Sequence, residues 1–332
     1  MISITKYRSP LRLRAKWEQL YSAGNFSPFQ SWTSNWWFYV VYHLKGSRLR
    51  FRPCFIRFSD ENDTCILPIA VDTQLKRVID FSAGGPIDYY DVISSTDNPI
   101  FLQECLSRLR DLYPDYEICF GNINQDSLLF SALKGDSFRP QTICAKIEFA
   151  SSSYDEYFKS LSKHQRQNIR TGYNKLSREE ITWRIEKFDA ANPMPRGVWK
   201  QCLRMYNERC NMKNKRANGL KRYWVEWKNS QVDLMNILIR KWNRVVSFVM
   251  FMDEQPVAYM SGMYNNQHDT FYVPRLSCSN SFLRYDTGIL MLNESIKLLL
   301  ADGVRTIDLT RGDEHYKFAM GAVAHTNYVL HL

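Results

Sequence analysis

The sequence has 332 residues, of which 45% are hydrophobic, and a formal net charge of +10 at pH 7. This length predicts roughly two folded domains with real hydrophobic cores, which excludes a largely disordered chain. The positive charge favours an anionic partner, such as a nucleotide-bearing cofactor, a nucleic acid, an acidic glycan or an anionic membrane surface, without choosing among them.

The first half of the chain, residues 1–150, predicts a mixed α/β domain. Two helices are expected within residues 12–44, and the break at Gly84-Gly85-Pro86 ends a run of three strands. The expected strands lie at about 49–58, 64–71, 78–82, 116–121 and 141–149, and further helices at about 99–112 and 125–133.

The second half, residues 151–332, begins with helical sequence from Ser153 to about Arg178. The expected strands lie at about 182–188, 233–240, 244–252, 256–264, 269–276 and 305–310, and the expected helices at about 195–212, 218–228 and 287–301. Several consecutive strands joined by short turns indicate an antiparallel meander. Both halves run from helices to strands and then to a helix and a strand, which suggests a duplicated fold.

Residues 306–318 form a short apolar strand followed at once by charged side chains. Ile307 and Leu309 alternate with polar neighbours, and Gly312 marks a turn before Asp313 and Glu314. The two carboxylates are candidates for a general base. An alternative is that Arg311, Asp313 and Lys317 form an ion-pair network that only fixes the turn.

Two basic segments are candidates for binding an anion. Lys159, Lys163, Arg166 and Arg170 fall three or four residues apart on one helix face, which indicates either a phosphate or acidic-substrate contact or an ordinary solvated face. Residues 200–222 form a second basic region, of which 211–221 is expected to be a mobile connection between helices that either has a function or is simply solvated.

A helix that begins near residues 285–289 is a third candidate. Gly288 sits at its opening, directly after a strand, where unpaired N–H groups and the helix dipole can hold a pyrophosphate. The alternative is an ordinary loop in which Asp286 or Thr287 caps the helix.

Several other kinds of site are not expected. The six histidines and eight cysteines do not have the spacing of a metal site. The cysteines include no CxxC pair, and we expect no disulfide framework. The sequence also lacks the nucleophile elbow that would indicate a covalent acyl-enzyme. His164 and His315 are interpreted as surface residues. No apolar run reaches the ~18 residues that span a bilayer, and the N-terminus lacks the apolar core of a signal peptide, so we expect a cytoplasmic protein. The spacing of the histidines and cysteines leads us to expect no metal.

Taken together, these segments resemble the CelD-like acetyltransferases of the GNAT superfamily, which are associated with cellulose and other polysaccharide biosynthesis and are related to the Fem peptidyltransferases. The blocks that carry the resemblance are Trp17 with Pro28-Phe29-Gln30 and Trp32/Trp36/Trp37, Asp88-Tyr89, 161–166 (LSKHQR) with 168–176, 285–290, and 308–317 (DLTRGDEHYK).

The resemblance implies two tandem GNAT-like domains, each a mixed, mostly antiparallel sheet flanked by helices. Residues 1–150 would form the acceptor side, and residues 151–332 would bind acetyl-CoA or another acyl-CoA as co-substrate. A GNAT site splays two strands apart, here expected at 256–264 and 269–276, and holds the pyrophosphate at the next helix N-terminus. The usual Q/R-x-x-G-x-G/A loop is reduced to Gly288 in this chain.

The resemblance also implies roles for individual residues. Asp313 or Glu314 would take the proton of the attacking amine, and Tyr272 or Tyr316 would protonate the thiolate or orient the acceptor. The expected cofactor-binding residues are Tyr285, Thr287, Gly288 and Ile289. The expected substrate-binding residues are Gln30, Asp88, Tyr89, Lys163, Arg166, Arg311 and Lys317.

The sequence therefore predicts an acyl-CoA-dependent N-acyltransferase that acts on an amino sugar or another small amine, in polysaccharide or cell-envelope biosynthesis, by direct attack in a ternary complex. Two alternatives stay open. One is Fem-like transfer from aminoacyl-tRNA, and the other is a non-catalytic GNAT scaffold that binds an acidic glycan or a protein partner. Neither the acceptor nor the oligomeric state follows from the sequence.

Overall fold

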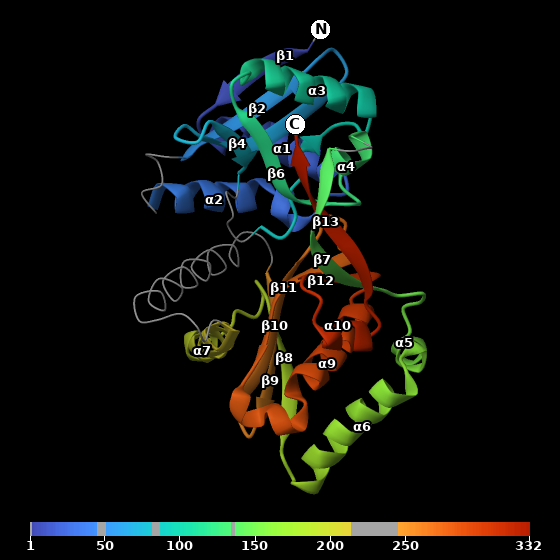
Figure 1. The fold of residues 1–332 in the computed structure, drawn as a ribbon. Helices are drawn as coiled ribbons and strands as arrows, with labels where there is room; N and C mark the ends of the chain where they lie inside the picture. The colour runs from blue at the N-terminus through green and yellow to red at the C-terminus, as the bar shows by residue number, and fades with distance from the viewer. Residues whose placement is uncertain (1, 45–50, 82–86, 134–136, 214–244) are drawn as a thin grey trace. The chain divides into compact units, whose positions relative to one another are not determined.

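The computed structural model describes residues 2–44, 51–81, 87–133, 137–213 and 245–332 (Figure 1). The chain divides into two compact units: unit 1 is residues 1–144 with 325–332, and unit 2 is residues 145–324. In each unit, helices flank a mixed sheet, which confirms the predicted α/β fold class.

The sheet of unit 1 has the strand order β1-β2-β3-β4-β6-β13, in which only β4 and β6 are parallel neighbours. Its strands are β1 (Ser3–Tyr7), β2 (Phe51–Ser59), β3 (Thr64–Asp72), β4 (Arg77–Asp80), β6 (Glu117–Asn124) and β13 (Val323–His331), and the short β5 (Ile93–Ser94) pairs with β3. Its helices are α1 (Arg14–Ala23), α2 (Trp32–Leu44), α3 (Pro99–Leu112) and α4 (Leu128–Ala132).

In unit 2 the strand order is β12-β11-β10-β9-β8, and β7 lies next to β12. The strands are β8 (Trp183–Phe188), β9 (Val246–Met252), β10 (Gln255–Tyr264), β11 (Thr270–Cys278) and β12 (Thr306–Arg311), together with the end of β7 (Phe138–Glu148), which begins in unit 1. The helices are α5 (Tyr154–Ser160), α6 (Lys163–Arg178), α7 (Arg196–Lys213), α9 (Thr287–Ala301) and α10 (His315–Ala319), and the 3-10 turn η4 (Asn280–Tyr285) precedes α9.

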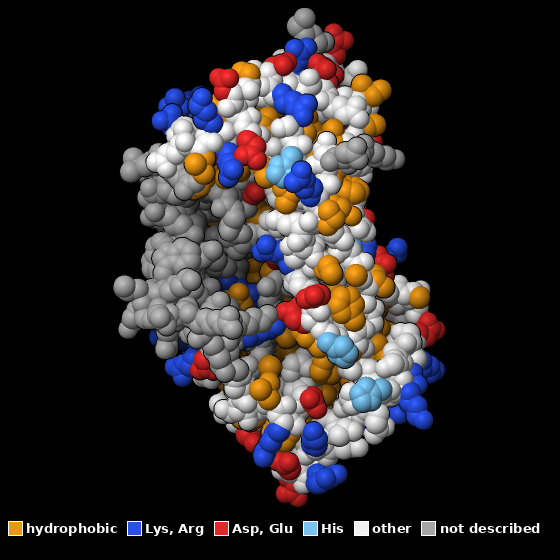
Figure 2. All heavy atoms as spheres, in the orientation of Figure 1, with side chains coloured by type: hydrophobic (Ala, Val, Ile, Leu, Met, Phe, Trp, Pro, Cys, Tyr) orange, Lys and Arg blue, Asp and Glu red, His pale blue; other side chains and the backbone are white. Residues whose placement is uncertain are grey.

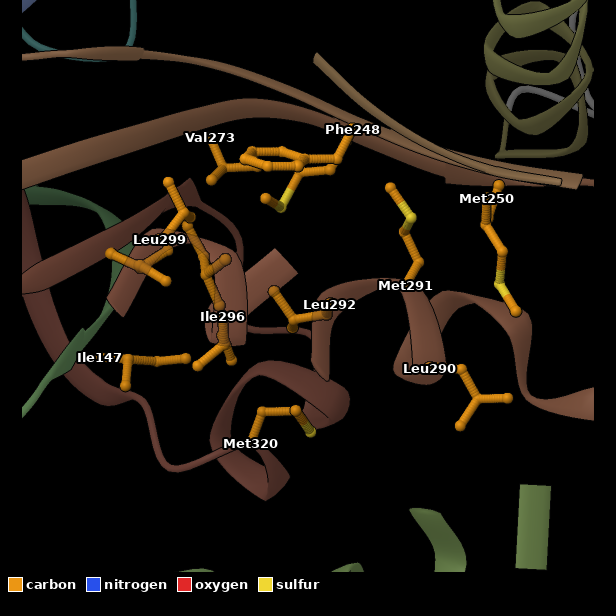
Figure 3. Close-up of a cluster of buried hydrophobic side chains, with 14 of the residues drawn as sticks. Ile147, Phe248, Met250, Val273, Leu290, Met291, Leu292, Ile296, Leu299 and Met320 are labelled. Atoms are coloured by element: carbon orange, nitrogen blue, oxygen red, sulfur yellow. The ribbon is translucent and has the colours of Figure 1, made fainter. Parts of the chain in front are cut away.

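Helices cover both faces of the unit 2 sheet. On one face, Phe248 and Met250 of β9 pack in a core with Leu292 and Ile296 of α9 (Figure 3). On the other face, Val249 of β9 packs with buried side chains of α7. Successive residues of a strand point to opposite faces, so a strand covered on both faces is buried throughout, as all seven residues of β9 are.

The predicted helices at 99–112 and 287–301 have those bounds in the structure. The helical segment expected from Ser153 to Arg178 is two helices, because Ser162 starts a new helix by accepting a hydrogen bond from the Gln165 N–H (3.1 Å). β1 and β13 were not predicted. β13 buries the polar His325 and Asn327, so it lacks the apolar alternation of an ordinary strand. The expected helix at 218–228 and strand at 233–240 lie outside the described residues.

Candidate active site

β11 and β12 of unit 2 are parallel but pair over only three residues, from Thr270↔Thr306 to Tyr272↔Asp308. Beyond that point Thr310 adopts a left-handed φ of +52°, and its N–H donates to Asp308 Oδ1 (2.7 Å). Past the backbone ladder, the Thr310 hydroxyl donates a hydrogen bond from Oγ1 to the Val273 carbonyl (3.3 Å). The second half of β11 is thus no longer paired with β12.

This corrects the expectation that strands 256–264 and 269–276 separate. These strands are β10 and β11, and their pairing extends from Tyr264↔Phe271 to Ala258↔Cys278. The physical reason lies in the connections. A short turn connects β10 directly to β11, so these antiparallel strands stay paired along their length. β11 and β12 are instead connected through α9, and this longer connection allows them to pair at one end only.

A β-bulge bends β11 where its pairing with β12 ends. Ser261 pairs with Arg275 and Met263 with Tyr272, so Gly262 alone stands opposite two residues of β11. A Cβ on Gly262 would lie 2.7 Å from Cζ of the Phe271 ring, and closer still to the Tyr272 carbonyl oxygen, so this position requires glycine. Bulges of this kind recur next to active sites, where they redirect a strand.

The N-terminus of α9 lies beside the last residue of β11. Thr287 is fully buried, and a Cβ on Gly288 would stand 3.6 Å from the Cys278 Sγ. Burial raises the pKa of the half-buried Cys278 thiol, whereas Arg209, the Thr287 side chain and the Gly288 N–H lower it. The first turn of α9 therefore offers a group with negative character the same stabilisation that it offers this sulfur.

Lys317 of α10 is a buried cation at the end of β12, with 3% of its surface exposed. Its Nζ donates to the carbonyls of Arg311 (2.9 Å) and Gly312 (3.1 Å) and lies 3.2 Å from Glu314 Oε2. Gly312 has a φ of +115°, and the Glu314 carboxylate folds back over it. Lys317 therefore fixes the turn and directs Glu314 inward.

Arg209 of α7 contacts the same carboxylate from the other side. Its Nη2 lies 3.6 Å from Glu314 Oε1, and its Nη1 donates to the Leu276 carbonyl in the second half of β11. Burial raises the pKa of the Tyr316 phenol, and the hydrogen bond and charge of Arg209 oppose this shift. Arg209, Cys278, Glu314, Tyr316 and Lys317 are named here the transfer cluster.

The structure separates the two predicted carboxylates. Glu314 belongs to the transfer cluster, whereas Asp313 is exposed, as are Arg311 and His315. Tyr272 lies in the last residue pair of the β11–β12 ladder, opposite Asp308. The turn thus has an inner carboxylate and an outer one.

The other predicted residues of unit 2 lie along α6, η4 and the start of α9. Tyr285 is buried, and its hydroxyl donates to Glu179 Oε2 (2.5 Å) just past α6. Ile289 is partly buried in the first turn of α9. Arg166 donates to the Lys159 carbonyl (2.7 Å) and the Leu161 carbonyl (2.5 Å), so it holds the α5–α6 turn together.

Lys163 is exposed at the start of α6, and Lys159, Arg170 and Arg178 are exposed on the same helix pair. Basic side chains accordingly appear on the surface over α5 and α6 (Figure 2). Among the described residues, these side chains form no hydrogen bond or ion pair with the transfer cluster.

In unit 1, Gln30, Asp88 and Tyr89 lie together and are all buried. Gln30 Nε2 donates to the Tyr89 carbonyl (2.9 Å), and the Asn327 amide donates to the Asp88 carbonyl (2.8 Å). The Tyr89 hydroxyl is hydrogen-bonded to His325 Nε2 (3.0 Å). β13 thus brings two residues to this group that sequence reasoning missed.

Sequence reasoning also missed Arg209 and Cys278. Arg209 lies one helical turn beyond the buried Met205, a spacing that places it on the sheet-facing side of α7, and this was the available signal. Nothing in the sequence pairs Cys278 with the start of α9.

The described part of the chain contains no group of three or more His, Cys, Asp or Glu side chains that could hold a metal ion. The seven cysteines that the structure describes are all free thiols. Among the described helices, none is both long enough and apolar enough to cross a membrane.

Comparison with known proteins places this geometry in context. Residues 163–318 match the model of the acetyltransferase (GNAT) domain, and this stretch contains the whole transfer cluster, the start of α9 and the separation of β11 from β12. The chain has a GNAT-type acyltransferase fold. No curated protein matches the sequence.

Three solved structures share the GNAT fold of this chain. The C-terminal domain of a candidate lysylphosphatidylglycerol synthetase from Agrobacterium fabrum is 10% identical, with a TM-score of 0.58 over 97% of this chain and 92% of that one. FemX is 11% identical, with a TM-score of 0.53 over 99% and 97% of the two chains. A tandem GNAT protein from the clavulanic acid biosynthesis pathway is 10% identical, with a TM-score of 0.51 over 100% and 98%.

Proposed function

We propose that this protein is an acyl-CoA-dependent N-acyltransferase that transfers an acetyl group to an amino sugar or another small amine. The observation that carries the proposal is the second half of β11, which is not paired with β12 and contacts both the start of α9, at Cys278, and Arg209, at the Leu276 carbonyl. This arrangement combines a strand edge, an anion-binding helix terminus and proton-transfer groups in one unit.

The donor is proposed to bind along β11. The amide groups of a pantetheine arm are suited to the strand edge beyond Tyr272, and the pyrophosphate is suited to the N–H groups at the start of α9. Gly288 presents no side chain there. Of the residues expected to bind the cofactor, Thr287, Gly288 and Ile289 are the first three residues of α9, and Tyr285 ends the preceding 3-10 turn.

The proposed chemistry is direct attack of a neutral amine on the thioester carbonyl. The new C–N bond forms as the C–S bond breaks, the amine loses one proton, and the departing thiolate gains one. Glu314 is proposed to accept the proton that the amine loses, and Tyr316 to donate a proton to the departing thiolate, since both residues belong to the transfer cluster. The positive charges of Arg209 and Lys317 favour the oxyanion and the thiolate that develop during transfer.

Acceptor binding is proposed for Lys163 and Arg311, which both belong to unit 2. Lys163 and Arg311 are exposed and can reach a ligand directly. An acceptor from polysaccharide or cell-envelope biosynthesis, which often bears anionic groups, suits the net charge of +10.

The release of free CoA thiol from acetyl-CoA, measured over a panel of amino sugars and small amines, tests the proposal. We expect Glu314→Gln to lower kcat about 100-fold or more, the usual contribution of a general base. The matched variant Asp313→Asn removes the neighbouring exposed carboxylate and is expected to change kcat less than about threefold. Equal losses in both variants would refute the assignment of Glu314.

A second candidate donor is aminoacyl-tRNA, because the exposed cations of α5 and α6 form a basic face. If this face binds tRNA, the affinity should fall steeply with salt, since each phosphate contact releases counterions. A gel-shift titration at two salt concentrations, with a Lys163/Arg170 double replacement by Gln as the test variant, separates this donor from acyl-CoA.

A further inference from the structure

Arg209 reaches the transfer cluster because α7 lies along β11. The Ser277 hydroxyl donates to the Met205 carbonyl (3.2 Å), and the Arg275 guanidinium stacks over the Tyr206 ring at 4.4 Å. Residue 209 is one turn beyond residue 205, so its side chain continues along the same strand. Two independent contacts thus fix α7 at the residues of β11 that have left β12.

The guanidinium of Arg209 joins three groups that belong to two other segments, β11 and the stretch from Glu314 to Tyr316. It donates to the Leu276 carbonyl of β11, lies 3.6 Å from the Glu314 carboxylate and is hydrogen-bonded to the Tyr316 side chain. A planar guanidinium carries five N–H donors in a fixed arrangement, which lets one side chain orient several acceptors, and lysine cannot reproduce that geometry.

Two cations flank the Glu314 carboxylate, and they come from different parts of the fold. Lys317, next to Oε2, is buried and bonded to the backbone of the turn, so it belongs to the folded framework. Arg209, next to Oε1, retains about 30% exposure of its side chain and comes from a different helix. Removing Arg209 therefore leaves the turn intact but releases Glu314 and Tyr316 on one side.

The geometry points to Arg209 as the positioning residue of the transfer reaction: it holds the Glu314 carboxylate and the Tyr316 phenol beside the free edge of β11. This inference rests on the proposed acyltransferase function. Among the described residues, the titratable groups that act on the Tyr316 phenol are Arg209 from α7, Cys278 from β11 and Glu314 from its own segment, and Arg209 is the cation among these three.

The test compares Arg209→Met and Arg209→Lys with Arg204→Met, an exposed arginine on the same helix. The first readout is the titration of Tyr316 by ¹⁹F NMR in protein labelled with 3-fluorotyrosine, with the signal assigned by Tyr316→Phe. Loss of the arginine should move this titration to higher pH, because a nearby cation favours the phenolate. Arg209→Lys should move it less, and Arg204→Met should leave it unchanged.

The second readout is steady-state acetyl transfer. Arg209→Met is expected to lower kcat about tenfold or more while the KM for acetyl-CoA changes less than about threefold, with partial rescue by lysine. A Tyr316 titration identical in Arg209→Met and Arg204→Met would overturn the inference. If loss of Arg209 shifts the ¹⁹F titration but the wild-type protein transfers no acetyl group, the proposed function is refuted, and with it the catalytic part of this role, while the contact is confirmed.

Discussion

Replacing Gly262 by alanine tests whether the β-bulge of β11 is as tightly determined as the structure indicates. The added methyl would lie 2.7 Å from Cζ of Phe271 and closer still to the Tyr272 carbonyl. Phe271 is fully buried, and backbone oxygen cannot rotate away as a flexible side chain would. β10 and β11 would have to separate locally, and the bulge that directs β11 away from β12 would be lost.

The cost follows from these contacts. Overpacking of a well-packed interior costs about 1–3 kcal/mol, and a clash with backbone lies at the upper end, so we expect about 3 kcal/mol. For a unit of this size, each kcal/mol lowers the melting temperature by about 2–4 °C, which gives a decrease of about 6–12 °C. Acetyl-CoA affinity should fall as well, because the donor is proposed to bind the strand that the bulge positions.

Differential scanning calorimetry on the wild type and two variants provides the assay. Gly197→Ala is the matched control, because a Cβ at this position in the first turn of α7 meets nothing within 4 Å. That change should be neutral or stabilise the protein by up to about 1 kcal/mol. If Gly262→Ala melts at the same temperature as Gly197→Ala, the argument about the bulge is refuted.

Two further predictions concern the transfer cluster. The rate at which iodoacetamide alkylates Cys278, followed by peptide mass spectrometry, should keep rising to a higher pH than for an ordinary thiol, because burial raises the pKa of this group. Acetyl-CoA at ten times its Kd should slow this alkylation about tenfold. An unchanged alkylation rate would show that the donor binds elsewhere. Lys317→Met should destabilise the protein by about 3 kcal/mol in urea unfolding, because it removes the cation beside Glu314 Oε2 and the donor to the carbonyls of Thr310, Arg311 and Gly312. The exposed Lys159→Met should cost less than about 0.5 kcal/mol.

Much of the fold could be predicted because the deciding interactions are local. α3 begins with Asn98, whose side chain accepts a hydrogen bond from the Ile100 N–H (3.0 Å), followed by Pro99 in the first turn. Its buried Leu102, Leu106 and Leu109 follow helical spacing. Signals of this kind are complete within a few residues, so the sequence alone defines where such a helix begins and ends.

The site was only partly predictable because its geometry depends on contacts between distant segments. The sequence offered Glu314, Tyr316 and the helix start at Gly288 as candidates, but it did not show which of the adjacent Asp313 and Glu314 turns inward. That choice depends on the positive φ of Gly312 and on Lys317. The contribution of Arg209 depends on where α7 packs, which no local pattern specifies.

Isothermal titration of the wild-type protein with acetyl-CoA, with free CoA as the comparison ligand, tests the central claim most directly. The proposed donor site lies within one unit and uses one free edge of β11 and one helix terminus, so we predict a single binding site per chain with a Kd below about 1 mM, the range in which enzymes commonly bind such substrates. Absence of binding heat with both ligands at millimolar concentration would contradict the claim that this chain uses acyl-CoA as its donor.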